Sequence, residues 1–333
     1  MVRSTDTTAV HLVDRPGVSV VVPTHNRRDL LEETLDSVFE QRGVFVEVIV
    51  VDDGSSDDTS TFLASVPDPR LRTIVHENSL GVATARNTGL RAASKPWVAF
   101  IDDDDLWAPE KLATQVSAME RSGDARWPCS AAIIINEHRL PIRHQPPLAR
   151  RDLAEVLLAR NVIPGGASGV VAATDLAREV GGFDPRFSVL ADWDFWIRLG
   201  LASPVATVSR VLHAYRIHPD GMSITTDVGP ELRLIEDKYV SERQARGVVF
   251  DRPAMTVWVG DRQQRAGLRL PAAESYLRSV PRISRAKAAL KAAEVLLWPK
   301  LYRSRDFLNG RRARRSVRAD VSRWLDRPVE PGA

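Results

Sequence analysis

The feature that most constrains the fold is a regular alternation of short apolar runs with helix-like segments between Val18 and Trp107. The apolar runs VSVVVPT, VEVIVVDD, LRTIVHE and WVAFIDDDD are rich in β-branched residues and end at turn residues, so they predict buried strands. Between them, RDLLEETLDSVFEQR and GVATARNTGLRAAS have the pattern of helices. Strands that alternate with helices predict a Rossmann-like α/β fold, with a mostly parallel sheet and helices on both of its faces.

The same reading extends through the next hundred residues. Pro109 is expected at the first position of a helix, and Asp29 with Glu32 and Asp152 with Glu155 resemble capping boxes. The segments expected as strands are SAAIIIN, GGASGVVAATDL and PVATVSRVLHAYRIH, the last of which should close the sheet, and ADWDFWIRLGLA is expected as a helix.

Polar and acidic residues gather where three of the predicted strands end. These clusters are Thr24-His25-Asn26, Asp52-Asp53-Gly54 and the run from Asp102 to Asp105. Ligands of parallel α/β sheets bind beyond the carboxyl ends of the strands. The sequence therefore predicts the functional site at this edge of the sheet.

The run from Asp102 to Asp105 is the strongest local signal. Four successive carboxylates repel one another, and a shared divalent cation with oxygen ligands relieves that repulsion. Mg²⁺ or Mn²⁺ held by one or two carboxylates and substrate phosphates is a recurring arrangement. The alternative is a solvated acidic turn.

Two further signals carry structural alternatives of their own. A carboxylate at Asp53 can accept hydrogen bonds from a base or ribose, or can simply form an Asx-type turn. Asp192 and Asp194 lie among aromatic residues, which raise the pKa of a carboxylate and favour a general base, although Asp192 can equally cap the helix. His218 is a candidate metal or diphosphate ligand, or a structural histidine.

Six stretches follow one another in the chain: VSVVVPTHNR, VEVIVVDDGSSDDT, NSLGVATARNTGL, WVAFIDDDDLWAPEKL, VGGFDPRF and ADWDFWIRL. Together they resemble the family 2 glycosyltransferases, which have the glycosyltransferase A-type fold. The resemblance covers roughly residues 17 to 225. It implies inverting, metal-dependent transfer of a sugar from a nucleotide-diphosphate donor, with a UDP-sugar favoured, to an acceptor hydroxyl.

The resemblance also implies site residues. Asp192 would be the general base, and Asp53 would recognise the nucleobase. Asp102, Asp104 and His218 would belong to the metal site, with Asp104 as the direct ligand. The residues implied in binding the donor are Pro23, Thr24, Asn26, Arg27, Asp53, Arg86 and Asp103.

One departure from the family pattern affects the last motif. The family commonly has Glu-Asp there, whereas this chain has Ala191 before Asp192. A carboxylate often found beside the base is therefore missing, which leaves Asp194 as a possible substitute for Asp192.

Missing motifs exclude other α/β enzymes. The stretch PTHNRRDL at the end of the first predicted strand contains no glycine, so the GxGxxG motif of nicotinamide dehydrogenases is absent there. The GxxxxGK[ST] motif of P-loop enzymes is also absent. A catalytically degenerate module that binds sugar nucleotides remains the alternative. No nucleic-acid motif accompanies the basic C-terminus, so no nucleic-acid partner is predicted.

The chain divides into a leader (1–16), a catalytic domain (17–228) and a helical C-terminal extension (229–333). The catalytic domain has a nucleotide-sugar half (about 17–107) and an acceptor half (about 108–228). The extension is basic from about residue 276, since the stretch from Tyr276 to Arg323 contains fourteen Lys or Arg and three acidic residues. A basic amphipathic helix with an apolar face of Ala286, Ala289, Leu290, Ala293 and Leu297 can contact an anionic membrane, or can pack on the domain with its arginines solvated.

These features also bear on location and acceptor. A single cysteine, Cys129, precludes an intramolecular disulfide, and no apolar run approaches the ~20 residues that span a bilayer. The sequence therefore predicts a cytoplasmic protein, with peripheral contact at the inner face of the membrane as an extension of that prediction. A lipid-linked molecule is among the acceptors that would suit such a place.

Overall fold

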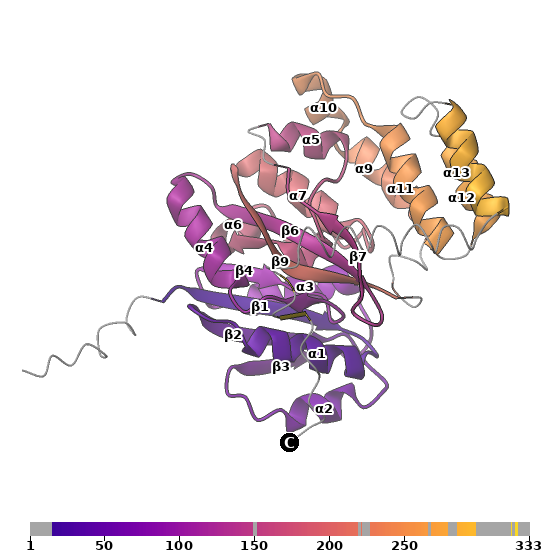
Figure 1. Cartoon of the computed structure of the whole chain (residues 1–333). Coiled ribbons are helices and arrows are strands. Elements are labelled where there is room, and N and C mark those ends of the chain that lie inside the picture. The colour runs from indigo at the N-terminus through magenta and orange to yellow at the C-terminus, as the bar shows by residue number, and fades with distance from the viewer. Residues whose placement is uncertain are drawn as a thin grey trace, which may run out of the picture.

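The computed structural model describes residues 15–148, 152–218, 221, 227–265, 268–278, 285–297, 321 and 324–325. The main sheet has five strands in the order β3-β2-β1-β4-β8, of which β1 to β4 are labelled in Figure 1. β1 to β4 run parallel and β8 runs antiparallel to β4, which confirms the predicted mostly parallel sheet. The strands are Gly17–Thr24 (β1), Phe45–Asp52 (β2), Leu71–Val75 (β3), Trp97–Phe100 (β4) and Val171–Ala173 (β8).

A second sheet lies beside the first, in the order β5-β9-β6-β7. An isolated bridge between Cys129 and Val170 connects the two. The prediction that the last strand closes the main sheet is wrong, because β9 pairs in parallel with the long strand β6 and lies inside the second sheet. Its strands are Leu106–Trp107 (β5), Trp127–Asn136 (β6), Pro141–Gln145 (β7) and Val205–Ile217 (β9).

Side chains of β1 alternate between two hydrophobic cores, as strand geometry requires. Val18, Val20 and Val22 pack with α1 and α4, whereas Val21 packs with α3, α5, α6 and α7. This alternation is why helices cover both faces of the main sheet. The helices are Arg28–Phe39 (α1), Thr59–Ser65 (α2), Val82–Ala92 (α3), Lys111–Ser122 (α4), Leu153–Ala159 (α5), Thr174–Glu179 (α6) and Ala191–Ala202 (α7).

Several predicted element ends are wrong. Asp29 and Glu32 form no capping box, because the N-cap of α1 is Arg27 and Asp29 already lies in the first turn, where Arg28 pairs with both carboxylates. Asp152 occupies the N-cap position of α5 without a side-chain capping hydrogen bond. α4 begins at Lys111, two residues after the predicted start at Pro109.

Two predicted strands also differ from the structure. β3 lies at the edge of the main sheet, so three of its five side chains (Arg72, Thr73 and Val75) are exposed rather than buried. The segment GGASGVVAATDL is not one strand. It forms a 3₁₀ turn at Gly166–Gly169 (η1), the short strand β8 and the start of α6.

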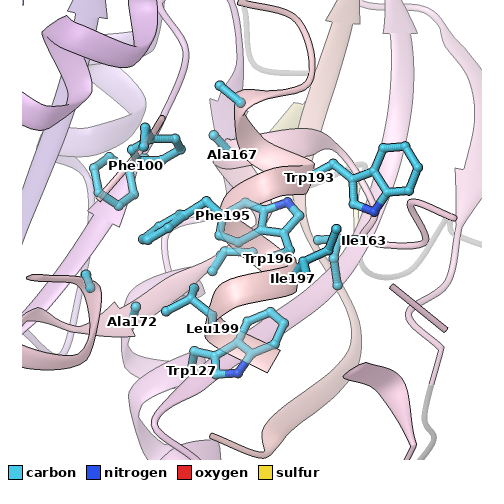
Figure 2. Packing of buried hydrophobic residues seen from close by; sticks show 14 of the residues in the cluster. Phe100, Trp127, Ile163, Ala167, Ala172, Trp193, Phe195, Trp196, Ile197 and Leu199 are labelled. Atoms are coloured by element: carbon cyan, nitrogen blue, oxygen red, sulfur yellow. The ribbon is translucent and has the colours of Figure 1, made fainter. Parts of the chain in front are cut away.

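Aromatic side chains fix α7 in the interior (Figure 2). The rings of Trp127 and Trp196 stack with centroids 6.1 Å apart, and Phe195 packs edge-on against Phe100 at 6.1 Å. The indole N–H of Trp193 donates to the carbonyl of Leu157 at 2.8 Å. Because the aromatic residues of the ADWDFW motif are held in the core, the first turn of α7 has one fixed position.

The first C-terminal helices pack back on the α7 side of the molecule (Figure 1). Ile235 and Tyr239 are buried in the same core as α7, and Met255 and Trp258 extend that contact. No helix among the described residues is long and apolar enough to cross a membrane. These helices are Gly229–Lys238 (α9), Val240–Arg246 (α10), Arg252–Arg265 (α11), Arg269–Arg278 (α12) and Arg285–Leu297 (α13).

Candidate active site

A pocket of about 420 Å³ opens where β1, β2 and β4 end. Residues from all three of the predicted strand-end clusters line it, together with the start of α7. The predicted site residues in its wall are Pro23, Thr24, Arg27, Asp53, Arg86, Asp102, Asp103, Asp104 and Asp192. Asn26 and His218 are the two predicted residues outside the wall.

Arginines neutralise the acidic run at the end of β4. Arg86, which is only 4% exposed, donates to Oδ1 of Asp102. Arg27 donates to Oδ1 of Asp103 and to Oδ2 of Asp104, each at 3.0 Å. The carboxylates therefore do not form a merely solvated acidic turn, since they are fixed in the pocket wall by cations from α3 and from the start of α1.

The four aspartates of this run are not equivalent. Burial raises the pKa of Asp103 to about 6, against the opposing charge of Arg27. Burial also raises the pKa of Asp105 well above its ordinary value. Asp105 is fully buried, accepts a hydrogen bond from Ser168 and lies outside the pocket wall, so its role is structural.

The chemistry of the acidic run fits a divalent cation. Asp102 and Asp104 offer hard oxygen ligands. Among the described residues, hydrogen bonds engage only Oδ1 of Asp102 and Oδ2 of Asp104. His218 contacts this site, with Nε2 2.9 Å from Oδ2 of Asp104. The described part of the chain has no group of three or more such ligands arranged around a metal, so a cation here would also need phosphate oxygens from a bound substrate.

Asp53 is held by the loop that follows β3. Its carboxylate accepts hydrogen bonds from the backbone N–H groups of Leu80 and Gly81, the hydroxyl of Ser79 and the ring of His76. Burial acts to raise the pKa of Asp53, but these hydrogen bonds outweigh it and lower the pKa. Asp53 therefore shapes the pocket by anchoring this loop, in addition to lining the pocket itself.

Asn26 shapes a neighbouring loop from outside the pocket wall. Its backbone has a positive φ of 54°, which asparagine tolerates better than most residues. Its side-chain oxygen accepts hydrogen bonds from the N–H groups of Ser56 and Asp57, at 2.7 and 3.3 Å. Asn26 therefore connects the ends of β1 and β2, and its contact with a nucleoside stays a prediction.

Asp192 lies in the first turn of α7 and faces the pocket. It is not the N-cap, which is Leu190, and its Oδ1 accepts a hydrogen bond from the N–H of Trp193 at 2.6 Å. Burial raises the pKa of Asp192 to about 6, against the opposing charge of Arg86. A carboxyl group with this pKa is ionised at neutral pH and can still accept a proton readily.

Asp194 does not substitute for Asp192. It is fully buried, and its carboxylate is held by Lys238 at 2.6 Å, by Arg198 at 2.6 Å and by the hydroxyl of Tyr239 at 2.7 Å. The prediction of a substitute base is wrong, because helical geometry turns Asp194 away from Asp192 toward α9.

Sequence reasoning missed several residues of the pocket wall. Trp258 and Arg262 of α11 line it, with the guanidinium of Arg262 stacked 4.8 Å from the ring centroid of Trp258. Arg143 and the glycine pair Gly165-Gly166 also line it. The glycine pair was the one available signal, since two adjacent glycines before a short strand indicate a close backbone approach.

The sequence of this region also matches a known protein family. The sequence model described as "Glycosyl transferase family 2" matches residues 19–168, the part that carries Asp53 and the acidic run.

The chain belongs to glycosyl transferase family 2.

Relatives of this family match different lengths of the chain. Succinoglycan biosynthesis protein ExoO of Rhizobium meliloti is 39% identical over 32% of this chain and 31% of its own length. A UDP-Glc:alpha-D-GlcNAc-diphosphoundecaprenol beta-1,3-glucosyltransferase of Escherichia coli, WfgD, is 37% identical over 31% of this chain and 40% of its own. These matches span less than half of the relatives' lengths. The uncharacterized protein MT1568 of Mycobacterium tuberculosis is 31% identical over 61% of this chain and 67% of its own.

A solved structure supports the fold of this family member. The chain matches S. aureus TarS 1-349 in complex with UDP-GlcNAc with a TM-score of 0.53 and 19% identity, over 86% of this chain and 92% of that one. At this identity the likeness concerns the fold alone. It agrees with the glycosyltransferase A-type architecture that the sequence predicts.

Proposed function

We propose that this chain transfers a sugar from a nucleotide-diphosphate donor to an acceptor hydroxyl, with inversion at the anomeric carbon and with a divalent metal. The observation that carries the proposal is that Asp192 and the Asp102–Asp104 run line one pocket, with Arg86 bonded to Asp102 and its charge acting on Asp192. A proton acceptor and a group of diphosphate-binding residues therefore share one cavity.

The donor would occupy the half of the pocket formed by the ends of β1, β2 and β4. Thr24 and Asp53 would bind the nucleoside, a uridine being favoured, and Asp103 would lie near the ribose or sugar. Arg27 and Arg86 place positive charge beside the acidic run, where the diphosphate would bind with the metal. Asp102 and Asp104 would hold Mg²⁺ or Mn²⁺, which neutralises charge on the departing diphosphate.

Asp192 would remove the proton from the acceptor hydroxyl as its oxygen attacks the anomeric carbon. The bond from that carbon to the diphosphate breaks in the same displacement, so no protein nucleophile is required. Inversion follows because the single displacement occurs from the face opposite the leaving group. The buried surroundings that raise the pKa of Asp192 suit this role.

The acceptor would enter from the wall formed by Gly165-Gly166, Arg143 and α11. Trp258 and Arg262, whose guanidinium lies over the Trp258 ring, line this part of the pocket and would contact the acceptor. The relative WfgD is named for transfer to a diphosphoundecaprenol-linked sugar. We therefore propose a lipid-linked sugar as the acceptor class.

A lipid-linked acceptor favours contact with an anionic membrane. Exposed leucines on α12 and α13 support this extension, with Leu270 74%, Leu277 51% and Leu290 55% exposed. The arginine-rich sequence between residues 298 and 320 would add electrostatic attraction, although it lies outside the described residues.

The proposal also gives the parts of the chain separate tasks. Residues 17–107 form the donor half and 108–228 the acceptor half, to which α11 adds one wall. The competing function is a degenerate module that binds the sugar nucleotide without transfer.

Metal dependence is tested with Asp104→Asn and its control Asp29→Asn, whose carboxylate is 91% exposed on α1. We expect Asp104→Asn to keep the melting temperature and to lose most of the sugar transfer, measured as nucleoside diphosphate released from a donor identified by thermal shift. Asp29→Asn should behave as wild type. Full transfer by the wild type in excess chelator would refute a metal at this site. If the wild type binds the donor with the metal present but transfers no sugar, the degenerate module is favoured instead.

A further inference from the structure

Glu231 is a buried carboxylate that reaches from α9 to the start of α7. It lies in the first turn of α9 and is 9% exposed. Its oxygens accept hydrogen bonds from the N–H and hydroxyl of Ser188 at 3.0 and 2.6 Å, and from the N–H groups of Val189 and Leu190 at 3.1 and 2.8 Å. One side chain from the C-terminal region therefore binds three successive residues of the catalytic half.

These three residues form the turn that leads into Asp192. Ser188, Val189 and Leu190 line the pocket, and Leu190 is the N-cap of α7 without a side-chain capping bond of its own. The first residue of α7 is Ala191, which supplies no acceptor. Backbone N–H groups at a helix start need acceptors, and here the acceptor comes from another helix.

We propose that Glu231 is a positioning residue for the base Asp192, fixing the Ser188–Leu190 turn and placing a second negative charge beside the start of α7. This inference rests on the proposed function of Asp192. It assigns to α9 a part in the reaction, since the helix supplies the carboxylate that holds the turn before Asp192.

The charges around Asp192 make the inference measurable. Burial raises the pKa of Asp192, and the charges of Asp102 and Glu231 raise it further, whereas Arg86 and the N–H of Trp193 lower it. Removal of the Glu231 charge should therefore lower the pKa of Asp192. A base with a lower pKa stays ionised to lower pH, so the acidic limb of the kcat profile should move to lower pH.

The experiment compares Glu231→Gln, Glu231→Asp and the control Glu236→Gln in the full chain. Glu236 lies on the same helix but pairs with Arg252, away from the pocket. We expect Glu231→Gln to lower kcat by about 10- to 100-fold through misplacement of the base, with unchanged affinity for the nucleoside diphosphate in calorimetry. Its acidic limb should lie at lower pH, whereas Glu231→Asp keeps the charge and should lower kcat without that movement.

Separate results distinguish the two proposals. A wild-type kcat and acidic limb in Glu231→Gln would overturn the positioning role, as would losses of kcat and donor affinity in equal proportion. If Glu231→Gln fails to fold, wild-type kcat in Glu231→Asp overturns it as well. The proposed function fails instead if Asp192→Asn retains full transfer, whatever the Glu231 variants do.

Discussion

Asp192 and Asp194 are two residues apart in one helix, yet the structure gives their carboxylates different surroundings. Asp192 meets the pocket and has one hydrogen bond, from the N–H of Trp193. Asp194 is saturated by Lys238 and two other donors in the interior. At the scale of single residues, exposure to the pocket and the availability of oxygen atoms separate a reactive carboxylate from a structural one.

The first prediction concerns these two carboxylates. Asp192→Asn should lower kcat by ~10²–10⁴, the range expected for loss of a general base, with little change in melting temperature. Asp194→Asn should instead lower the melting temperature, because it removes the buried negative charge that Lys238 and Arg198 share. Unfolding curves and transfer assays measure both effects. A destabilised but active Asp192→Asn together with a stable but inactive Asp194→Asn would contradict the assignment.

The pH dependence of transfer follows from the same residue. Because burial raises the pKa of Asp192 to about 6, the carboxyl group becomes protonated as the pH falls through 6. A protonated carboxyl cannot accept the acceptor's proton, so kcat should fall about tenfold for each pH unit below that value. A kcat profile that stays flat from pH 7 to pH 4.5, with the protein still folded, would exclude Asp192 as the base.

Asp53 gives a prediction about stability as well as binding. Asp53→Asn removes the carboxylate charge and, with an amide NH₂ in place of Oδ2, takes the acceptor from the N–H of Gly81, whereas the N–H of Leu80 can still donate to Oδ1. A hydrogen bond to a charged group contributes about 1.5–3 kcal/mol, so the free energy of unfolding should fall by up to about that much. Denaturant unfolding measures it, and calorimetry with a nucleoside diphosphate should show weaker binding. An unchanged unfolding midpoint would mean that the loop does not depend on Asp53.

At the scale of elements, the 3₁₀ turn that begins at Gly166 brings backbone close to the base. Both glycines have positive φ, of 62° and 60°. A Cβ atom on Gly165 would lie 2.1 Å from Nε2 of His213, and one on Gly166 would lie 3.3 Å from Oδ2 of Asp192. His213, which is buried in β9, therefore leaves room only for a glycine at position 165.

Gly166→Ala tests this close approach. A non-glycine residue in the left-handed region costs roughly 1–2 kcal/mol, and Gly123→Ala is the matched control, since Gly123 has φ of 78° and nothing within 4 Å of its Cβ position. Both variants should lose similar unfolding free energy, but only Gly166→Ala should lower kcat, because its methyl group crowds Asp192. Equal kcat values in the two variants would contradict a role for Gly166 at the base.

At the scale of the whole molecule, the C-terminal helices belong to the site rather than to an appendage. α9 contacts α7 through Lys238 and Glu231, and α11 contributes Trp258 to the pocket wall. α13 packs on its neighbours through Val295, and Lys291 lies 3.0 Å from Asp261. The predicted apolar face of α13 is partly wrong, because Ala289 and Leu290 are exposed while Ala292 and Val295 are buried. Leu290 is thus left for other contacts.

Membrane contact is tested at this scale with the double variant Leu270→Ser/Leu290→Ser. The control is Leu140→Ser, because Leu140 is 48% exposed but lies outside α12 and α13. The wild type should sediment with anionic vesicles and not with neutral ones, less so as salt rises. The double variant should sediment less, and Leu140→Ser should match the wild type. Equal recovery of all three proteins with neutral and anionic vesicles would refute the contact.

The sequence by itself determined the alternating strands and helices, the parallel main sheet and the three acidic or polar strand ends. These follow from local patterns, since a period of two and a period of 3.6 are visible in one segment at a time. It also predicted Asp102 and Asp104 as pocket residues, because strand ends of a parallel sheet meet at one edge. Asp192 was predicted from its aromatic neighbours and from the family resemblance.

Only the tertiary structure decided the rest. The structural role of Asp194 depends on Lys238, 44 residues away in sequence. The carboxylate that accepts hydrogen bonds from the Ser188–Leu190 turn belongs to Glu231, 43 residues after Ser188. Such partners carry no local periodicity, because they are chosen by how helices pack rather than by the order of residues. For the same reason β9 could be recognised as a strand but not assigned to its sheet.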